Sequence, residues 1–507
     1  MWPKVKALLF QNTSARQTVA KNTFWLAVSN FGGRLLRGFV VIYAARVLGV
    51  TEWGIFSYAL AIATFFTVFS DLGISYVLVR DTTKQADPAG RIRLVSTALY
   101  LKLGLLFLGV ILILFAAPHL KIIAADDSTI ERAKVILPII ALIVIFDTLR
   151  EFGFAFIRAI ERMEVETLLY LTTNLGIAIF GFWFLAMGRT VQNFAWAYVA
   201  GTGLGMSFTF FALRRHFRGI LGSFSAATAR KVLATSWPFA VSGMLGIMLL
   251  NTDIFMIGLL RTTEEVGLYS ADNRIIQLFY IIPAIFTVSV LPLFGRLARQ
   301  DDKRLRSILE RTLGTLFLIA IPAAAGGFLL RADIIGFVFG SSYLPGALAF
   351  GILMLTLLVD FPALILNNLL FAYDRQRKTV IYSLIGGVLN VFLNLLLLPY
   401  FGIVGCAIGT LLAQGISNVY LWRAARQELF FSIAPNLIKM VLSTAVMSGG
   451  VLILDQLGSP LFLTVGAGVL IYAAALGILR EPLLKEARLI LQPLASGGPK
   501  EHAADAG

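Results

Sequence analysis

The sequence is poor in charge, in cysteine and in histidine, and each shortage excludes a class of protein. Asp, Glu, Lys and Arg make up 14% of its 507 residues, whereas a soluble domain carries about 25%. The single cysteine, Cys406, lies in an apolar run, which excludes an internal disulfide and a thiolate metal site. The three histidines form no metal-ligand pattern. We therefore expect no metal and no cofactor.

The chain is rich in apolar residues. Hydrophobic residues make up 58% of it, and the mean hydropathy is +0.83. Fourteen apolar stretches are each long enough to cross a bilayer core of about 30 Å. Because backbone polar groups cannot stay unpaired in lipid, each stretch must be a helix. The predicted spans are 23–45, 54–79, 94–116, 134–157, 167–187, 192–212, 233–259, 268–293, 312–331, 346–372, 379–399, 403–422, 437–455 and 460–479.

The basic residues of the loops predict the orientation. The net charge is +15, and we attribute it to topology rather than to nucleic-acid binding, because most of the excess lies in alternate short loops. The positive-inside rule places those loops and both termini in the cytoplasm. The segment 1–22 lacks the apolar core and cleavage site of a signal peptide. The opposite loops hold few basic residues: Arg46, Lys121, Arg132, Lys134, Arg189, Arg261 and Arg331.

The chain repeats itself at an offset of 213 residues. Short matches at this offset occur at three separated places, and they include Glu52, Gly54 and Ser57 with Glu265, Gly267 and Ser270, and Asp147 with Asp360. Parallel repeats of this kind are typical of secondary transporters with a site between two lobes. The repeat predicts an all-α membrane protein with an N-lobe of six helices (23–230), a C-lobe of six (231–430), two further spans (431–480) and a cytoplasmic tail (481–507).

Charged residues inside the spans predict a hydrated cavity. Each one costs roughly 2.5–3.5 kcal/mol at a helix centre that faces lipid, so most must pair or face water. The sharpest group is Arg34 and Arg37, which share one face of the first helix with Asn30. Arg274 and Gln277 share a face near the outer end of the eighth span, where Asp253 of the seventh span is a candidate partner. We predict that these residues line a substrate cavity.

The remaining intramembrane acids allow two interpretations. Asp147, Arg150 and Glu151 are spaced to form ion pairs within one helix, which favours a structural role. Asp360, the repeat mate of Asp147, lacks such an arginine, and both aspartates remain candidates for ion coupling. Asp71 belongs to the predicted cavity, and Lys102 is either its partner or part of the same inner vestibule.

Two motifs resemble the opening of the polysaccharide-biosynthesis flippases, which are also called O-antigen or oligosaccharide flippases. The first motif runs from Ala45-Arg46-Val47-Leu48-Gly49 to Gly54-Ile55-Phe56, and the second is Asp71-Leu72-Gly73-Ile74. That family belongs to a superfamily that also contains multidrug and toxin extrusion exporters and the lipid II flippase. The resemblance implies fourteen helices in two lobes and a cationic cavity lined by helices one, two, seven and eight.

The resemblance also implies a function. Such a protein moves a polyprenyl-diphosphate-linked oligosaccharide across the bacterial cytoplasmic (inner) membrane by alternating access, and is not an enzyme. Its expected partners are the lipid-linked oligosaccharide, membrane lipids and polysaccharide-assembly proteins such as a glycan polymerase. A multidrug exporter or a lipid II flippase remains an alternative. A membrane-embedded glycan polymerase is a more remote one, because no loop is long enough to form a soluble domain.

Overall fold

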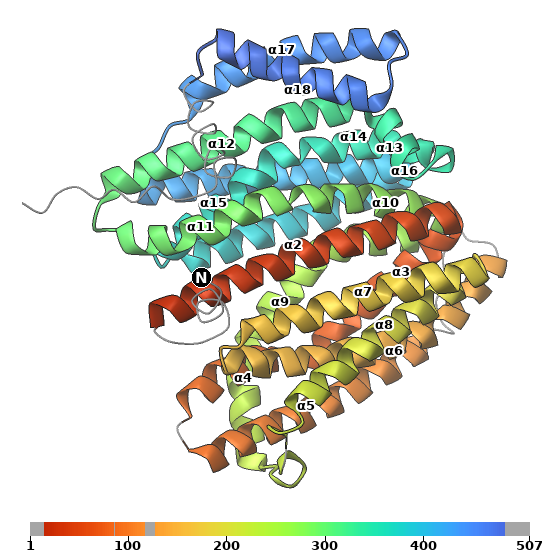
Figure 1. Cartoon of the computed structure of the whole chain (residues 1–507), viewed down its shortest axis with the longest axis vertical. Helices are drawn as coiled ribbons and strands as arrows, with labels where there is room; N and C mark the ends of the chain where they lie inside the picture. The colour runs from red at the N-terminus through yellow and green to blue at the C-terminus, as the bar shows by residue number, and fades with distance from the viewer. Residues whose placement is uncertain (1–14, 86, 117–126, 218, 482–507) are drawn as a thin grey trace, which may run out of the picture.

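The computed structural model describes residues 15–85, 87–116, 127–217 and 219–481, and every regular element in these residues is a helix (Figure 1). The elements, in chain order, are α2 (Ala15–Leu48), α3 (Val50–Asp71), α4 (Ile74–Lys84), α5 (Pro88–Ala116), α6 (Asp127–Ala159), α7 (Met163–Met187), α8 (Val191–Leu213), η2 (Ile220–Gly222), α9 (Ala226–Leu260), α10 (Thr263–Phe279), α11 (Ile281–Leu297), α12 (Asp302–Leu329), α13 (Arg331–Val338), η3 (Ser341–Gly346), α14 (Ala347–Leu355), α15 (Leu357–Ala372), α16 (Gln376–Glu428), α17 (Ala434–Gln456) and α18 (Leu461–Ile478).

The helices follow the apolar runs, as the bilayer requires. Among the described residues, nine helical segments are long and apolar enough to cross a membrane. The chain is thus an all-helical, multi-pass membrane protein. Several helices begin at a polar residue whose side chain accepts a hydrogen bond from a backbone N–H of the first turn, and these residues are Thr190, Ser225, Thr262 and Asp301.

The sequence analysis was wrong about one span, because 54–79 is not a continuous helix. The helix α3 ends at Asp71, and α4 begins at Ile74. Leu72 and Gly73 between them have φ angles of 40° and 76°, a conformation that interrupts the helical hydrogen bonds and favours glycine. The apolar pattern continues across this break, so hydropathy alone cannot detect it.

One further span differs from its prediction. The predicted span 268–293 begins earlier, at Thr263, and is divided at Tyr280 into α10 and α11. Pro283, three residues later, has no N–H to donate to the preceding turn. The predicted spans 379–399 and 403–422 are confirmed as the two helical arms of α16, which non-helical backbone at Gly402, with a φ of 57°, separates.

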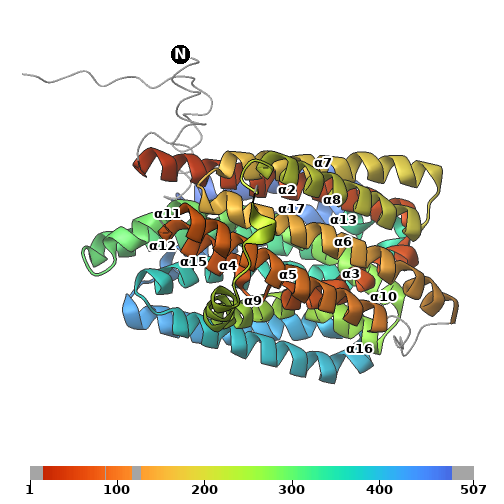
Figure 2. The ribbon, with the colours of Figure 1, turned by 90° about the horizontal axis from the view of Figure 1, so that it is seen from below.

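The helices form two groups that lie side by side (Figure 1). The N-terminal half, α2 to α8, packs mainly through α2, α6, α7 and α8, and the C-terminal half runs from α9 to α16. The helices α17 and α18 pack on each other and on α12 at one edge. The first turns of α9 lie against α4 and α5, so the first helix of the C-terminal half extends into the N-terminal half (Figure 2).

Candidate functional site

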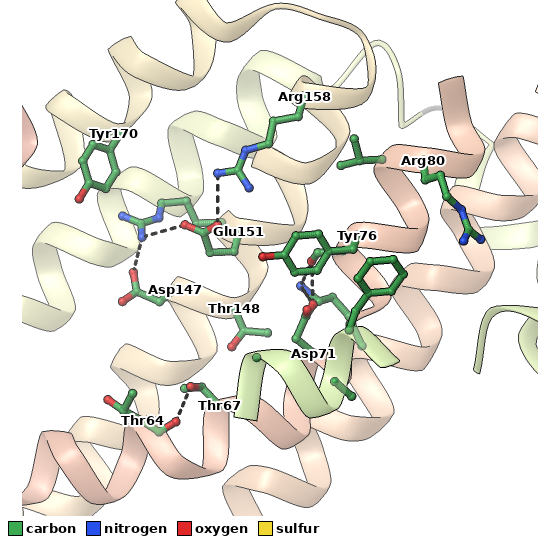
Figure 3. Close-up of a pocket in the computed structure, with 18 of the residues that line it drawn as sticks. Thr64, Thr67, Asp71, Tyr76, Arg80, Asp147, Thr148, Glu151, Arg158 and Tyr170 are labelled. Carbon is green, nitrogen blue, oxygen red and sulfur yellow. Dashed lines mark hydrogen bonds and ion pairs between the residues drawn. The ribbon is translucent and has the colours of Figure 1, made fainter. Parts of the chain in front are cut away.

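A pocket of about 880 Å³ lies in the N-terminal half, between α2, α3, α4, α5, α6, α7 and the middle of α9 (Figure 3). Its wall is unusually charged for a membrane protein. Five of the lining residues are cations, namely Arg37, Arg80, Lys102, Arg150 and Arg158, and three are acids, namely Asp71, Asp147 and Glu151. Charges in this number require water or mutual pairing. Arg80 and Arg158 pair with Asp81 and Glu166 from outside the lining, so Arg37 is the one cation of the lining with no ion pair among the described residues.

Asp71 and Lys102 pair on one wall of this pocket. The Lys102 ammonium lies 2.7 Å from Asp71 Oδ1 and donates to Ser75 Oγ at 2.9 Å. Ser75 in turn donates to Asp71 Oδ1 at 2.7 Å. Both expected roles of Lys102 are therefore present, because it is the partner of Asp71 and it lines the pocket. Removing one partner from such a pair typically costs about 3–5 kcal/mol where the remaining charge is buried.

Arg150 lies at the centre of a second charged group. Its guanidinium is 2.9 Å from Asp147 and 3.6 Å from Glu151, which confirms the ion pairing that the spacing predicts. Its side chain is only 4% exposed. Nε and Nη1 have no hydrogen-bond partner among the described residues, and the guanidinium lies over the rings of Phe154 and Tyr170, 5.3 and 5.8 Å from the ring centres.

Arg158 extends this group toward α7. It makes hydrogen bonds to both carboxylate oxygens of Glu166 and lies 3.8 Å from Glu151 (Figure 3). Arg158 was not among the site residues predicted from the sequence. Its position at the end of α6 gave no sequence signal for a place in the pocket, because the partner Glu166 belongs to the next helix.

Arg37 lines the pocket from α2, whereas its neighbour Arg34 does not belong to the described lining. Arg37 Nε donates to Asn174 Oδ1 on α7 at 3.3 Å. Arg34 lies one turn earlier and is exposed. The side chain of Asn30, the third member of the predicted stripe, lies outside the described part of the structure. The structure thus separates two arginines that the sequence analysis grouped.

Arg274 and Gln277 form a hydrogen bond with each other at 3.1 Å on α10. The helix α10 packs against α2, and the charges of Arg274 and Arg37 lie close enough to repel each other. Arg274 does not belong to the described lining of the pocket. Its place in a substrate cavity stays a prediction.

Asp253 is bound by neutral groups instead of Arg274. Its carboxylate accepts hydrogen bonds from Tyr269 at 2.5 Å, Asn390 at 3.0 Å, Asn394 at 2.8 Å and Thr410 at 2.8 Å. These donors come from α10 and from both arms of α16. The sequence could not indicate this shell, because its members are separated from Asp253 by up to 157 residues.

Asp360 on α15 has a similar environment. The Tyr280 hydroxyl donates to Asp360 Oδ2. With its amide oriented so that the nitrogen faces the carboxylate, Gln414 donates to the same oxygen at 3.2 Å. Asp147 faces Arg150, whereas Asp360 has neutral donors. This difference agrees with the sequence, which has no arginine beside Asp360.

At the opposite end from the pocket, the two halves meet at a seam formed by Gly54, Ser57, Gly267 and Ser270. The Oγ atoms of Ser57 and Ser270 are 3.1 Å apart. A Cβ added at Gly54 would lie 1.9 Å from the Thr263 carbonyl oxygen, and one at Gly267 would lie 2.0 Å from the Val50 carbonyl oxygen. The helices α3 and α10 therefore touch backbone to backbone.

Two further contacts reinforce the seam. The Tyr343 hydroxyl donates to the Ala45 carbonyl at 2.7 Å, and Arg46 donates to the Phe337 carbonyl at 3.2 Å. Both join α2 to the segment of α13 and η3 in the C-terminal half. This end of the contact between the halves is tightly packed, while the other end contains the pocket.

The sequence analysis missed the aromatic part of the pocket. Tyr76 of α4 and Phe239 of α9 both line it, and their rings stack with centres 5.3 Å apart and an angle of 12° between the planes. The only signal in the sequence was Gly73. Its motif indicates the family, but it does not indicate that the helix is broken there. Among the described residues, no group of three or more His, Cys, Asp or Glu side chains is placed to hold a metal ion.

Comparison with known proteins gives the family. The model of the polysaccharide biosynthesis protein family matches residues 19–298, and that of the MatE family matches residues 238–396. A probable flippase of Haloferax volcanii, AglR, is 31% identical over 34% of this chain, and the match spans 37% of that relative. A second protein of that organism, the probable low-salt glycan biosynthesis flippase Agl15, is 21% identical over 79% of this chain and 82% of its own. A putative O-antigen transporter of Shigella flexneri is 22% identical over 77% of this chain and 94% of its own.

Solved structures give the same fold. The lipid II flippase MurJ in an inward closed conformation has a TM-score of 0.75, with 18% identity over 92% of this chain and 99% of its own. An inward-facing multidrug resistance transporter of the MATE family has a TM-score of 0.63, with 15% identity over 82% of this chain and 95% of its own. At these identities the likeness concerns the fold. The chain therefore belongs to the polysaccharide biosynthesis protein family of membrane transporters.

Proposed function

We propose that this protein flips a polyprenyl-diphosphate-linked oligosaccharide from the cytoplasmic to the outer leaflet of a bacterial inner membrane, for the biosynthesis of cell-surface polysaccharide. The proposal includes fourteen spans, the two lobes 23–230 and 231–430, and cytoplasmic termini. The observation that carries it is the pocket, whose lining holds five cations, among them Arg37, which has no ion pair among the described residues and therefore has its charge available to an anion. Its proposed partners are the lipid-linked glycan, membrane lipids and other polysaccharide-assembly proteins.

The chemistry of a diphosphate headgroup fits this pocket. Guanidinium groups bind phosphate through planar, charge-assisted pairs of hydrogen bonds, and Arg37, Arg150 and Arg158 all line the cavity. A volume of about 880 Å³ lies in the range of ligand pockets. We propose that Arg37 and Arg274 guide the anion between the halves, and that Asn30, Arg34, Gln277 and Asp253 belong to the same substrate cavity.

Alternating access requires one end closed while the other is open. The seam at Gly54 and Gly267 supports a closed outer end, and the pocket supports an inner end that accepts substrate. On the positive-inside orientation, the ends of α3 and α6 that border the pocket lie toward the cytoplasm. The diphosphate would bind there while the polyprenyl chain stays in the bilayer.

The membrane potential offers a driving force. Moving one charge is worth about 2.3 kcal/mol per 100 mV, so a doubly anionic headgroup that moves outward gains roughly twice as much. Ion coupling is an additional proposal, and Asp360 is better suited to it than Asp147. The donors to Asp360 are the neutral Tyr280 and Gln414, whereas Asp147 is held in an ion pair with Arg150.

The match to the MatE family over residues 238–396 favours a second candidate, a drug exporter. A cationic drug would need acids to outnumber cations in its pocket, and here the balance is reversed. A lipid II flippase remains close in chemistry to the first proposal, because lipid II also carries a glycan on a polyprenyl diphosphate.

The test is the flipping of a fluorescent polyprenyl-diphosphate oligosaccharide in proteoliposomes. We expect flipping by the wild-type protein, a loss of at least about tenfold with Arg37→Ala because one charge-assisted contact to the anion is removed, and no change with Arg377→Ala, an exposed arginine outside the pocket. Comparison with Arg34→Ala asks which arginine of α2 contacts the substrate. Export of a cationic dye without flipping of the lipid would replace this proposal by the exporter.

A further inference from the structure

The break between α3 and α4 brings two aromatic rings together in the pocket, a feature that the binding of an anion does not require. A Cβ added at Gly73 would lie 2.6 Å from Phe239 Cβ and from the Ser236 carbonyl oxygen. Gly73 thus lets α4 approach the backbone of α9 closely. The next turn of α4 then presents Tyr76 to Phe239, and the two rings stack with an angle of 12°.

One face of this aromatic stack remains open. Tyr76 is 61% exposed, and Phe239 is partly buried. Both rings line the charged pocket. Figure 3 shows the Tyr76 hydroxyl pointing toward the wall that carries Thr148 and Glu151. A large apolar ring left open inside a polar, hydrated cavity loses the free energy of burial, and such a surface marks a place where a ligand packs.

The ligand that matches this surface has one apolar face and a polar edge. A pyranose ring has that shape, because its axial C–H groups form a flat apolar face while its hydroxyl groups point outward around the ring. The carboxylates of Asp71 and Glu151, which are 31% and 44% exposed, line the same pocket and are acceptors for those hydroxyl groups. Arg150 and Lys102 lie deeper, with 4% and 3% of their side chains exposed.

We propose that the stacked Tyr76–Phe239 pair, named here the aromatic platform, binds a sugar ring of the lipid-linked oligosaccharide. This inference rests on the proposed function and adds to it a division of the pocket. Arg37, Arg150 and Arg158 take the diphosphate, and the platform with its neighbouring carboxylates takes the saccharide. On this proposal, the helix break at Leu72 and Gly73 places the aromatic platform beside the charged residues of the pocket.

The experiment compares two fluorescent lipids in proteoliposomes, a polyprenyl diphosphate with an oligosaccharide and the same lipid without sugar. Tyr76→Ala is expected to lower flipping of the glycosylated lipid about tenfold, the upper range for one aromatic contact, and to leave the sugar-free lipid within about twofold. Tyr76→Phe and Tyr76→Trp, which keep a ring, are expected to restore most of the rate. Phe107→Ala is the control, since it removes an exposed ring of α5 outside the described pocket lining.

The outcomes separate this inference from the function on which it rests. Equal losses for both lipids with Tyr76→Ala would assign Tyr76 a structural role and overturn the platform alone. Unchanged flipping of both would do the same, and would assign Tyr76 to the aromatic belt at the membrane interface. A wild-type protein that flips neither lipid would overturn the proposed function and the platform together.

Discussion

At an offset of 213 residues, Gly54 and Ser57 of the N-terminal half correspond to Gly267 and Ser270 of the C-terminal half, and the structure brings these four residues into contact. The charged pocket shows the opposite behaviour. Its members Asp71, Lys102, Arg150 and Glu151 correspond at the same offset to Ala284, Thr315, Ala363 and Leu364. Only Asp147 has an ionisable counterpart, Asp360.

The seam and the pocket differ because each places a different requirement on its residues. At the seam, the backbones of α3 and α10 approach each other so closely that both helices need a glycine there. In the pocket, one half alone can carry the charges, because a single headgroup needs one set of partners. The C-terminal half instead surrounds Asp253 and Asp360 with neutral donors, an arrangement that suits protonation or ion binding better than capture of an anion.

The largest effect is expected from fixing the seam. In the double variant Ser57→Cys, Ser270→Cys, the two sulfur atoms replace oxygens that are 3.1 Å apart, close to the geometry of a disulfide. Mild oxidation should cross-link them and abolish flipping, and a reductant should restore it. The only native cysteine, Cys406, is buried, so each single variant serves as a control. Full flipping by the cross-linked protein would contradict alternating access through this seam.

The next effect concerns the charges of the N-terminal half. Arg150→Met keeps much of the side-chain volume but leaves Asp147 and Glu151 without the cation that pairs with them. We expect a loss of about 1–3 kcal/mol in stability, discounted from the fully buried case because both acids are partly exposed. Thermal unfolding in detergent measures this loss. The companion variant Ala363→Arg, at the equivalent position of the C-terminal half, should not rescue it, and a rescue would show that the halves are interchangeable.

A smaller effect tests the acids that correspond in the repeat. Asp360→Asn keeps a polar group among Tyr280 and Gln414 but removes the ionisable carboxylate. If Asp360 couples transport to protons or sodium, the rate should fall severalfold only when an ion gradient is imposed. Asp147→Asn should lower the rate with and without a gradient, because it disturbs Arg150. The same response in both variants would remove the distinction between the halves.

The smallest effect belongs to a group of three charged residues, in which Glu428 at the end of α16 pairs with Arg375 and Lys378 at its beginning. Burial opposes ionisation of Glu428, but hydrogen bonds from Lys378 and Arg375 outweigh it and hold the pKa of this carboxyl below its ordinary value. A lowered folded-state pKa stabilises the protein above the unfolded-state pKa, and the stabilisation is lost as pH falls through the folded-state value. Glu428→Gln should therefore lower stability by about 1 kcal/mol or less at neutral pH. The difference from wild type should vanish in acid, and a difference that persists there would assign it to packing.

Much of the fold could be predicted from the sequence, because lipid leaves a chain few choices. Apolar runs must be helices in a bilayer, and the predicted ranges fall on the observed elements from α2 to α18. The break at Leu72 and Gly73 could not be predicted in this way, since hydropathy records which residues avoid water and not how the backbone turns. Part of the site was also predictable, namely the pairing of Asp71 with Lys102 and of Asp147 with Arg150, because the latter pair needs only helical spacing.

The sequence by itself determined that the chain is a helical membrane protein. It also determined that short segments of the two halves match at an offset of 213 residues, and that charged residues inside the membrane need partners. Tertiary structure alone decided which partners those charges have. It gave Asp253 the shell of Asn390, Asn394 and Thr410, placed Arg37 but not Arg34 in the described pocket lining, and stacked Tyr76 on Phe239. The physical reason is that periodicity fixes contacts three or four residues apart, whereas contacts between helices depend on how closely their backbones approach, and small residues such as Gly54, Gly73 and Gly267 set that approach.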